Sequence, residues 1–417
     1  MKEVPLWTLF KNFQKGLFNN DFLKVLGILK PFFQEGFKPP EAALPLPYKP
    51  KFAFYSNYER ISMQDLLSLS PAELEALLLS VGEPKYRAGQ MFPQLHKGLS
   101  PAEMTNIGKK TREKLSEVAE YHLPRVRRKL VSALDGTVKY LFELKDGNCV
   151  ESVVMRYNHG NTICISSQVG CRMGCKFCAS TIGGKVRDLI PGELLGQVIA
   201  AQKDMGERIS NIVMMGIGEP LDNYDNVVKF LRLVAHPDGL NIGYRHISLS
   251  TCGVVSGIYK LAEEEFPITL SISLHAPDDE TRSSIMPINN RWGVDELLTA
   301  CKDYYDRTGR RLSFEYTLIA GKNDTVEGAS KLANVLNRHL RTRTTTMPIH
   351  VNLIPVNEVE ETGFSRSSDE AVKAFAAVLE KRGIRATVRR KLGADINASC
   401  GQLRRAEQKE QNEGLCP

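Results

Sequence analysis

Short apolar runs alternate with amphipathic stretches along the chain from residue 159 onward. Glycine, proline or polar residues bound each run, and the runs cover residues 162–166, 211–216, 245–250, 268–273, 312–317, 350–355 and 384–389. Runs of this length are typical of buried parallel strands, and the stretches between them have the helical period. The alternation predicts a parallel βα-barrel or an open α/β sheet, in which the loops after the strands carry the chemistry.

The chain between residues 61 and 158 is patterned differently. Residues 61–124 have a helical period and two capping-box signatures, Ser70-Pro71-Ala72-Glu73 and Ser100-Pro101-Ala102-Glu103. They predict a small helical domain whose mostly basic face is either simply solvated or an RNA-binding accessory surface. Residues 125–158 alternate apolar and polar positions around two Asp-Gly turns, which predicts a β-meander linker.

The two ends differ again from the rest of the chain. Residues 1–60 are rich in aromatic residues and proline and predict an N-terminal extension of unknown role, and residues 406–417 form a polar tail. The most apolar early stretch, residues 22–33, is interrupted by lysines and is shorter than the roughly 20 residues of a spanning helix. We therefore expect no membrane span.

The amino-acid composition indicates the cellular compartment but says little about the function. Nine cysteines in 417 residues are too few for a disulfide-stapled secreted scaffold, and no signal-peptide pattern opens the chain, so we expect a reducing cytoplasm. The net charge of +7 suits a polyanionic partner but does not require one.

Three cysteines lie within eight residues after the first predicted strand: Cys171, Cys175 and Cys178. Structural zinc sites have four protein ligands, often as two C-x-x-C pairs, and no matching fourth cysteine is nearby. Three thiolates on a [4Fe-4S] cluster leave one iron free to chelate a small molecule. The spacing therefore predicts a [4Fe-4S] cluster with one open iron.

This C-x-x-x-C-x-x-C loop resembles that of the radical S-adenosylmethionine (SAM) superfamily. Further motifs at later strand ends resemble the RlmN/Cfr family of adenine-methylating RNA methyltransferases, over residues from about 61 to 405. These motifs are Gly218-Glu219-Pro220-Leu221, Ser250-Thr251-Cys252-Gly253, Ser273-Leu274-His275-Ala276-Pro277 and Asp395-Ile396-Asn397-Ala398-Ser399-Cys400-Gly401-Gln402-Leu403. The resemblance implies an α/β fold with a partial (β/α)6 radical SAM barrel over residues 159–405.

The resemblance also implies contacts with SAM, of which two molecules are used per turnover, one as methyl donor and one as radical source. The implied contact residues are Gly218, Glu219, Ser250, Ser273, Leu274, His275 and Asn357. Their chemistry suits the cofactor, because a carboxylate can accept from its ammonium group and glycine admits close backbone approach.

Three catalytic roles follow from the resemblance alone. Cys400 would carry the methyl group and form a transient protein–RNA adduct, and Cys164 would resolve that adduct through a transient disulfide bond. Glu151 would accept the ring proton. Without the resemblance, Cys164 would be a small core hydrophobe and Glu151 a surface carboxylate.

Basic clusters indicate phosphate contacts without reading sequence. They are Arg125, Arg127, Arg128 and Lys129; Arg338, Arg341 and Arg343; and Arg389, Arg390 and Lys391. The family's substrates are adenines in 23S rRNA and tRNA, and we expect a monomer that takes electrons from a donor such as flavodoxin or ferredoxin. Two alternatives stay open: Cfr-type methylation of carbon 8 of the rRNA adenine, and a non-catalytic iron–sulfur protein that binds RNA.

Overall fold

The computed structural model describes residues 63–341, 347–358, 362–398, 401–405 and 407. The chain divides into residues 1–60 and a second unit, residues 61–417, and every described residue belongs to the second unit. The expected N-terminal extension, most of the polar tail, Arg343 and Cys400 lie outside the described residues.

A helical layer opens the second unit. Its elements are β1 (Gln64–Asp65), α3 (Pro71–Ser80), α4 (Tyr86–His96), α5 (Lys109–Val118) and β2 (Ala119–Glu120), with β1 and β2 paired in parallel. The first expected capping box forms: the Ser70 backbone N–H donates to Glu73 Oε2 at 2.7 Å, and the Glu73 N–H donates to Ser70 Oγ at 3.3 Å. Helix α3 therefore begins where the sequence predicts.

The second expected helix start is wrong. The Ser100 N–H does donate to Glu103 Oε2 at 2.7 Å, but turns follow, and α5 begins only at Lys109. Thr105, Asn106 and Gly108 are poor helix formers, so the bonds at Ser100 close a turn that no helix continues.

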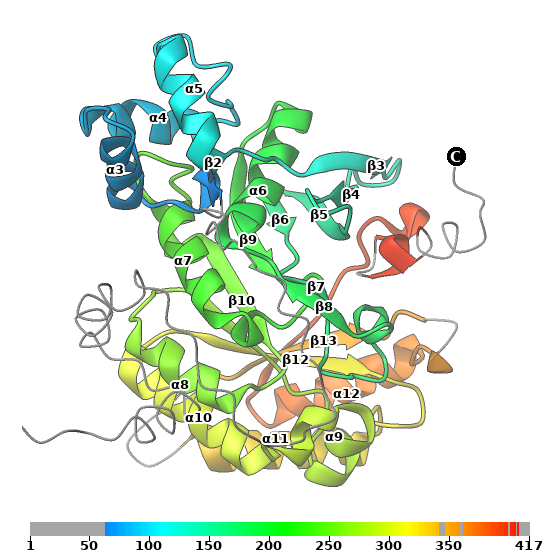
Figure 1. Cartoon of the computed structure of the whole chain (residues 1–417). Coiled ribbons are helices and arrows are strands. Elements are labelled where there is room, and N and C mark those ends of the chain that lie inside the picture. Colours follow the sequence, from blue (N-terminus) through cyan, green and yellow to red (C-terminus); the bar gives the residue numbers. More distant parts are fainter. Residues whose placement is uncertain (1–62, 342–346, 359–361, 399–400, 406, 408–417) are drawn as a thin grey trace, which may run out of the picture. The chain divides into compact units, whose positions relative to one another are not determined.

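A ten-stranded sheet forms the rest of the described unit, in the order β14-β13-β12-β11-β10-β9-β6-β5-β4-β3 (Figure 1). Its parallel strands correspond to the apolar runs of the sequence and are β6 (Gly160–Cys164), β9 (Ile209–Met214), β10 (Ile247–Thr251), β11 (Thr269–Ser273), β12 (Leu312–Leu318), β13 (His350–Pro355) and β14 (Arg385–Val388). The antiparallel strands that extend the sheet beyond β6 are β3 (Arg125–Val131), β4 (Val138–Glu143) and β5 (Cys149–Tyr157). The α/β fold expected from the sequence is confirmed.

Helices connect the parallel strands. They are α6 (Pro191–Met205), α7 (Tyr224–Ala235), α8 (Val255–Glu263), α9 (Asp279–Ile285), α10 (Val294–Thr308), α11 (Val326–Leu340) and α12 (Asp369–Lys381). A separate antiparallel pair, β7 (Gln168–Gly170) and β8 (Lys185–Asp188), brackets the three-cysteine loop. No helix in the described part of the chain is long and apolar enough to cross a membrane.

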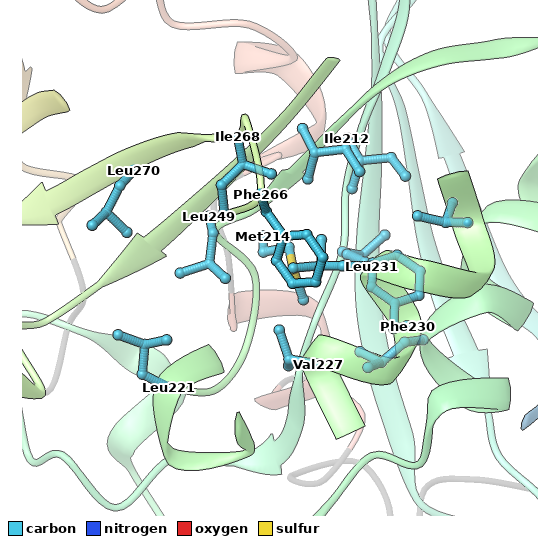
Figure 2. Close-up of a cluster of buried hydrophobic side chains, with 14 of the residues drawn as sticks. Ile212, Met214, Leu221, Val227, Phe230, Leu231, Leu249, Phe266, Ile268 and Leu270 are labelled. Atoms are coloured by element: carbon cyan, nitrogen blue, oxygen red, sulfur yellow. The ribbon is translucent and has the colours of Figure 1, made fainter. Parts of the chain in front are cut away.

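The core lies between the sheet and its helices. Figure 2 shows Met214 of β9, Leu249 of β10 and Phe230 of α7 in one cluster of buried side chains. Because side chains alternate along a strand, Ser248 faces the opposite side from Leu249, where its Oγ lies 3.2 Å from Ser271 Oγ of β11. At β10 and β11 the sheet is therefore apolar toward the helices and polar on its other face.

Candidate active site

The cysteines of the three-cysteine loop are largely withdrawn from solvent, whereas Arg172, Gly174 and Lys176 between them are exposed. Cys171 and Cys175 are buried, and Cys178 is half-buried. Burial raises the pKa of the Cys171 thiol to about 12 and also raises that of Cys175. These thiols are therefore protonated in the protein without metal, and binding iron would release protons.

None of the described cysteines forms a disulfide with another described cysteine. Among the described residues, no three His, Cys, Asp or Glu side chains converge as ligands of a single metal ion. Thiolates that each bind a different iron of a cubane need not converge on one point. The three cysteines do line one common cavity, so the donor set fits a cluster better than a single ion.

This cavity, here called the cofactor cavity, has a volume of about 210 Å³. Besides the three cysteines, its lining includes five of the residues expected to contact SAM: Gly218, Glu219, Ser250, Ser273 and His275. The other two lie elsewhere, because Leu274 is fully buried and Asn357 lines the neighbouring cavity. The tertiary fold thus gathers residues from three successive strand ends beside the cysteines.

Glu219 presents a buried carboxylate to the cofactor cavity. One oxygen accepts from the Leu221 N–H at 3.0 Å, and Oε2 accepts from the Cys252 N–H at 2.7 Å. Burial raises the pKa of Glu219, and these bonds work against that rise. The carboxylate is held in place by the loops after β9 and β10, with acceptor sites left for a cation.

Gly218 allows the backbone to pass close to the loop after β6. Its φ is +108°, and a Cβ at this position would lie 2.7 Å from the backbone nitrogen of Gln168. A side chain is excluded both by the conformation and by the contact.

His275 is fixed in one tautomer. Its Nδ1 accepts from the Thr317 backbone N–H at 2.9 Å, so the proton of the neutral ring is on Nε2. Burial lowers the pKa of His275 to about 3, which keeps the ring neutral near pH 7. The ring also makes an edge contact with Phe177 of the cysteine loop, with centroids 5.0 Å apart.

A second cavity of about 310 Å³ adjoins the first and is here called the adjacent cavity. The two cavities share the lining residues Phe177, Cys178, Thr317, Ile354 and Arg389. The lining of the adjacent cavity also contains Cys164, Asn357, Arg390, Lys391 and Ala398. Cys164 is buried, and it lies on the same apolar face as Val153 and Met155. The expected resolving cysteine and one basic cluster thus border a single space.

Glu151 lies on the same face of β5 as Val153 and Met155, two residues before Val153, but it lines neither cavity. It is buried, and its carboxylate accepts from the backbone N–H groups of Gly401 at 2.8 Å and Arg404 at 2.6 Å. Lys139 Nζ lies 3.2 Å from Glu151 Oε2. Cys400 itself is outside the described residues, but the residue after it is bonded to the carboxylate expected to act with it.

The residue after Cys400 also meets the cysteine loop. Gly401 packs against Ala179 and Ser180, which directly follow Cys178. The two motifs are more than 200 residues apart in the sequence, and the fold brings their flanks into contact.

Sequence reasoning missed two residues of the site. Glu315 is buried, lines the cofactor cavity and accepts from Asn352 Nδ2 at 2.7 Å. Arg282 is fully buried and donates to the carbonyls of Cys252 at 2.7 Å and Leu274 at 3.1 Å, which joins the loops after β10 and β11. A charged residue in an apolar strand was the available signal for Glu315, while nothing local distinguishes Arg282.

Comparison with known proteins adds independent findings. Residues 165–333 match the model of the radical SAM superfamily, and residues 64–121 match that of the ribosomal RNA large subunit methyltransferase N-terminal domain. The chain is 51% identical over 345 residues to a probable dual-specificity RNA methyltransferase RlmN of Clostridium novyi, covering 82% of this chain and 98% of the relative. A relative of the same description from Clostridium acetobutylicum is 52% identical over 344 residues, covering 82% and 97%.

One solved structure is similar over the same region. The crystal structure of a radical SAM methyltransferase from Sphaerobacter thermophilus matches with a TM-score of 0.76 and 41% identity. The match covers 81% of this chain and 98% of the other.

Proposed function

Because the chain belongs to the RlmN family of radical SAM RNA methyltransferases, we propose that it methylates carbon 2 of a specific adenine in 23S rRNA and of an adenine in tRNA. Two points support this proposal. The relatives are described as dual-specificity RNA methyltransferases, which supports two kinds of RNA substrate, and the helical layer matches a ribosomal RNA methyltransferase domain, which supports rRNA as one of them.

The enzyme's cofactors are a [4Fe-4S] cluster and SAM, and Cys171, Cys175 and Cys178 are the residues that would hold the cluster. When bound, they supply an electron and a reductively cleavable sulfonium, respectively. The chain's own contribution is a cavity beside the cysteine loop, a carboxylate at Glu219 for an ammonium group, and a neutral His275 whose Nε2–H can donate.

We propose that Cys400 is the methyl carrier. Its thiolate sulfur would take the methyl group from one SAM molecule, with S-adenosylhomocysteine as the leaving group, and that methyl group would lose one hydrogen atom to the radical that a second SAM molecule supplies. The remaining carbon bonds to the adenine ring, which links protein to RNA. Glu151 accepts the ring proton, and the Cys164 thiolate attacks the Cys400 sulfur, so that an S–S bond forms as the S–C bond breaks; the freed carbon takes up a proton, and the remaining electron would return to the cluster. Glu151 is hydrogen-bonded one residue away from Cys400, which supports its part in this step.

One observation carries the proposal: the cofactor cavity and the adjacent cavity meet at Cys178. The first cavity holds the cysteine loop and the expected SAM contacts, and the second holds Cys164 and Ala398, two residues before Cys400. A radical source and a methyl carrier must lie within reach of one target atom, and adjoining cavities meet that demand.

The position of the new methyl group tests the reaction. Anaerobically reconstituted enzyme is incubated with 23S rRNA fragments and with tRNA, and mass spectrometry of the digested nucleosides locates the methyl group. We expect 2-methyladenosine from both RNAs. A methyl group on carbon 8 would reject the assignment in favour of Cfr-type chemistry, and product from one RNA alone would reject dual specificity.

Two cysteine variants test the covalent route. Cys400→Ala is expected to bind iron and to cleave SAM slowly but to transfer no methyl group, and methylation at the wild-type rate would contradict the carrier role. Cys164→Ala is expected to accumulate an RNA–protein crosslink visible on a denaturing gel. Cys149→Ala is the matched control and should form no crosslink, because the Cys149 thiol lines neither cavity. If Cys164→Ala also forms no crosslink, Cys164 is a core residue and not the resolving cysteine.

We also propose that the enzyme acts as a cytoplasmic monomer with an external electron donor such as flavodoxin or ferredoxin. An external donor is required because the cluster must be reduced before SAM is cleaved and the Cys164–Cys400 disulfide must be reduced before the next turnover, and no residue of the described site supplies these electrons. Activity with purified flavodoxin and its reductase, compared with dithionite, tests the donor.

A further inference from the structure

Strands β3 to β5 form a support for the segment that carries Cys400. Residues of the turn between β3 and β4 form hydrogen bonds with this segment on the N-terminal side of Cys400. The Gly393 N–H donates to Asp135 Oδ2 at 2.8 Å, and Ser132 Oγ donates to Asp395 Oδ1 at 2.7 Å. Ala398 packs on the apolar face formed by Val153 and its neighbours. The segment is therefore bound to the sheet at several points between residues 393 and 398.

Lys139 of β4 lies beneath this segment and is fully buried. Its Nζ donates to the Asn397 carbonyl oxygen at 3.1 Å and lies 3.2 Å from Glu151 Oε2. Glu151 in turn accepts from the backbone N–H groups of Gly401 and Arg404. One buried ammonium thus connects the backbone three residues before Cys400 with the backbone one residue after it.

We propose that Lys139 is a positioning residue for methyl transfer, which fixes the backbone on both sides of Cys400, directly at Asn397 and through Glu151 at Gly401. This inference rests on the proposed role of Cys400 as methyl carrier. Lys139 lines neither cavity, so it acts on the segment that carries Cys400, here called the carrier segment, and not on substrate or cofactor.

The physical reason is that a buried charge holds its partners in one arrangement. A lysine and a glutamate that are both withdrawn from water need each other and their hydrogen bonds, since neither charge is solvated elsewhere. Any displacement of the carrier segment would break bonds to both groups at once. A misplacement of about 1 Å at a reacting centre can cost on the order of a hundredfold in rate, so such a clamp has catalytic value.

The test compares Lys139→Met with Lys145→Met. Both remove an ammonium group and keep an unbranched stem, but Lys145 lies on the exposed turn after β4, where it pairs with Glu120. Hydrogen–deuterium exchange of the full chain is followed at the amides of Gly401 and Arg404. We expect exchange there to accelerate by at least about tenfold in Lys139→Met, while peptides of β9 to β12 and all peptides of Lys145→Met keep wild-type rates.

A kinetic measurement separates positioning from general loss of structure. In Lys139→Met we expect kcat for RNA methylation to fall by about a hundredfold, with an unchanged KM for RNA and an unchanged rate of 5′-deoxyadenosine formation without RNA. Wild-type exchange at Gly401 and Arg404, or equal losses in methylation and 5′-deoxyadenosine formation, would overturn the proposal.

A second variant covers the case in which Lys139→Met does not fold. Asp395→Asn removes an acceptor of the Ala133 N–H, which donates to Asp395 Oδ2 at 2.8 Å, at an exposed position that leaves no buried charge unpaired. We expect faster exchange over residues 393–404 and a lower kcat with unchanged KM, and unaltered exchange would contradict a clamped segment. The exchange readout needs no methyl product, so an enzyme that makes no 2-methyladenosine refutes the proposed function and leaves this test valid.

Discussion

Gly401 lies directly against Ser180: a Cβ on Gly401 would be 3.0 Å from the backbone nitrogen of Ser180. Gly401 also has a φ of +82°, in the left-handed region. Cys400 precedes Gly401, and Cys178 lies two residues before Ser180. The absence of a side chain at residue 401 therefore sets how closely the residues after Cys400, the proposed methyl carrier, approach the cysteine loop.

Gly401→Ala should push the segment that follows Cys400 away from the cysteine loop. The new methyl group meets backbone atoms, which cannot move aside as a flexible side chain would, so we expect RNA methylation to fall by at least about tenfold with iron content unchanged. Gly309→Ala is the control, because Gly309 also has a positive φ of +62° but no atom within 4 Å of its Cβ position. It should lose about 1–2 kcal/mol of stability in urea unfolding and keep its activity. Equal activity of the two variants would contradict this contact.

The cluster assignment predicts different outcomes for two buried cysteines. Cys171→Ala should lose most of the roughly four irons per chain expected of a [4Fe-4S] cluster, because one ligand of three is missing. Cys301 lies in the core on α10 and lines neither cavity, so Cys301→Ala should keep its iron and its visible absorbance. Iron analysis after anaerobic reconstitution measures the iron content of both variants. A full complement of iron in Cys171→Ala would show that Cys171 is not a ligand of the cluster.

RNA binding should depend on the cations at the rim of the adjacent cavity. Arg390 and Lys391 are exposed and line that cavity, so each can reach a phosphate of a nucleotide placed there. The double variant Arg390→Ala/Lys391→Ala should weaken binding to single-stranded RNA. It should also reduce the slope of log K against log salt by about 0.7 for each phosphate that is no longer neutralised. Lys331→Ala on α11, a well-exposed lysine outside the lining, should leave the slope unchanged.

The helical layer should give stability a specific acid dependence. Burial, and to a smaller degree the charge of His236, lowers the pKa of His96 to about 4. The unfolded chain, with a His pKa of about 6.5, binds more protons than the folded chain between pH 6.5 and pH 4. The stability that neutral His96 contributes is therefore fully present above pH 6.5 and is lost as the pH falls toward 4. From pH 8 to pH 5 we expect His96 to account for a loss of about 2 kcal/mol.

Urea unfolding of His96→Leu at the two pH values measures this contribution. The variant should lose less stability between pH 8 and pH 5 than the wild type does, by the same amount. His159→Leu, at an exposed position, should follow the wild type. A parallel drop in His96→Leu and wild type would mean that another group titrates.

Local pattern determined the elements and the cluster loop. The seven apolar runs became parallel strands because alternation, length and bounding glycines act over a few residues. Ser70 and Glu73 formed the expected cap for the same reason. The cysteine spacing could be interpreted from the sequence because the three cysteines, the proposed cluster ligands, lie on one short loop. At Ser100 the same local signal failed, since a cap does not ensure that a helix follows.

Only the tertiary structure decided what the meander of residues 125–158 does. Its alternation predicted strands, but it could not indicate that they continue the barrel sheet or that the segment around Cys400 covers their face. The bond between Glu151 and Gly401 joins residues 250 positions apart, and the buried Lys139 became interpretable only with it. The alternation of apolar and polar residues specifies which face of a strand is buried. Which segment packs on that face depends on the packing of the whole chain.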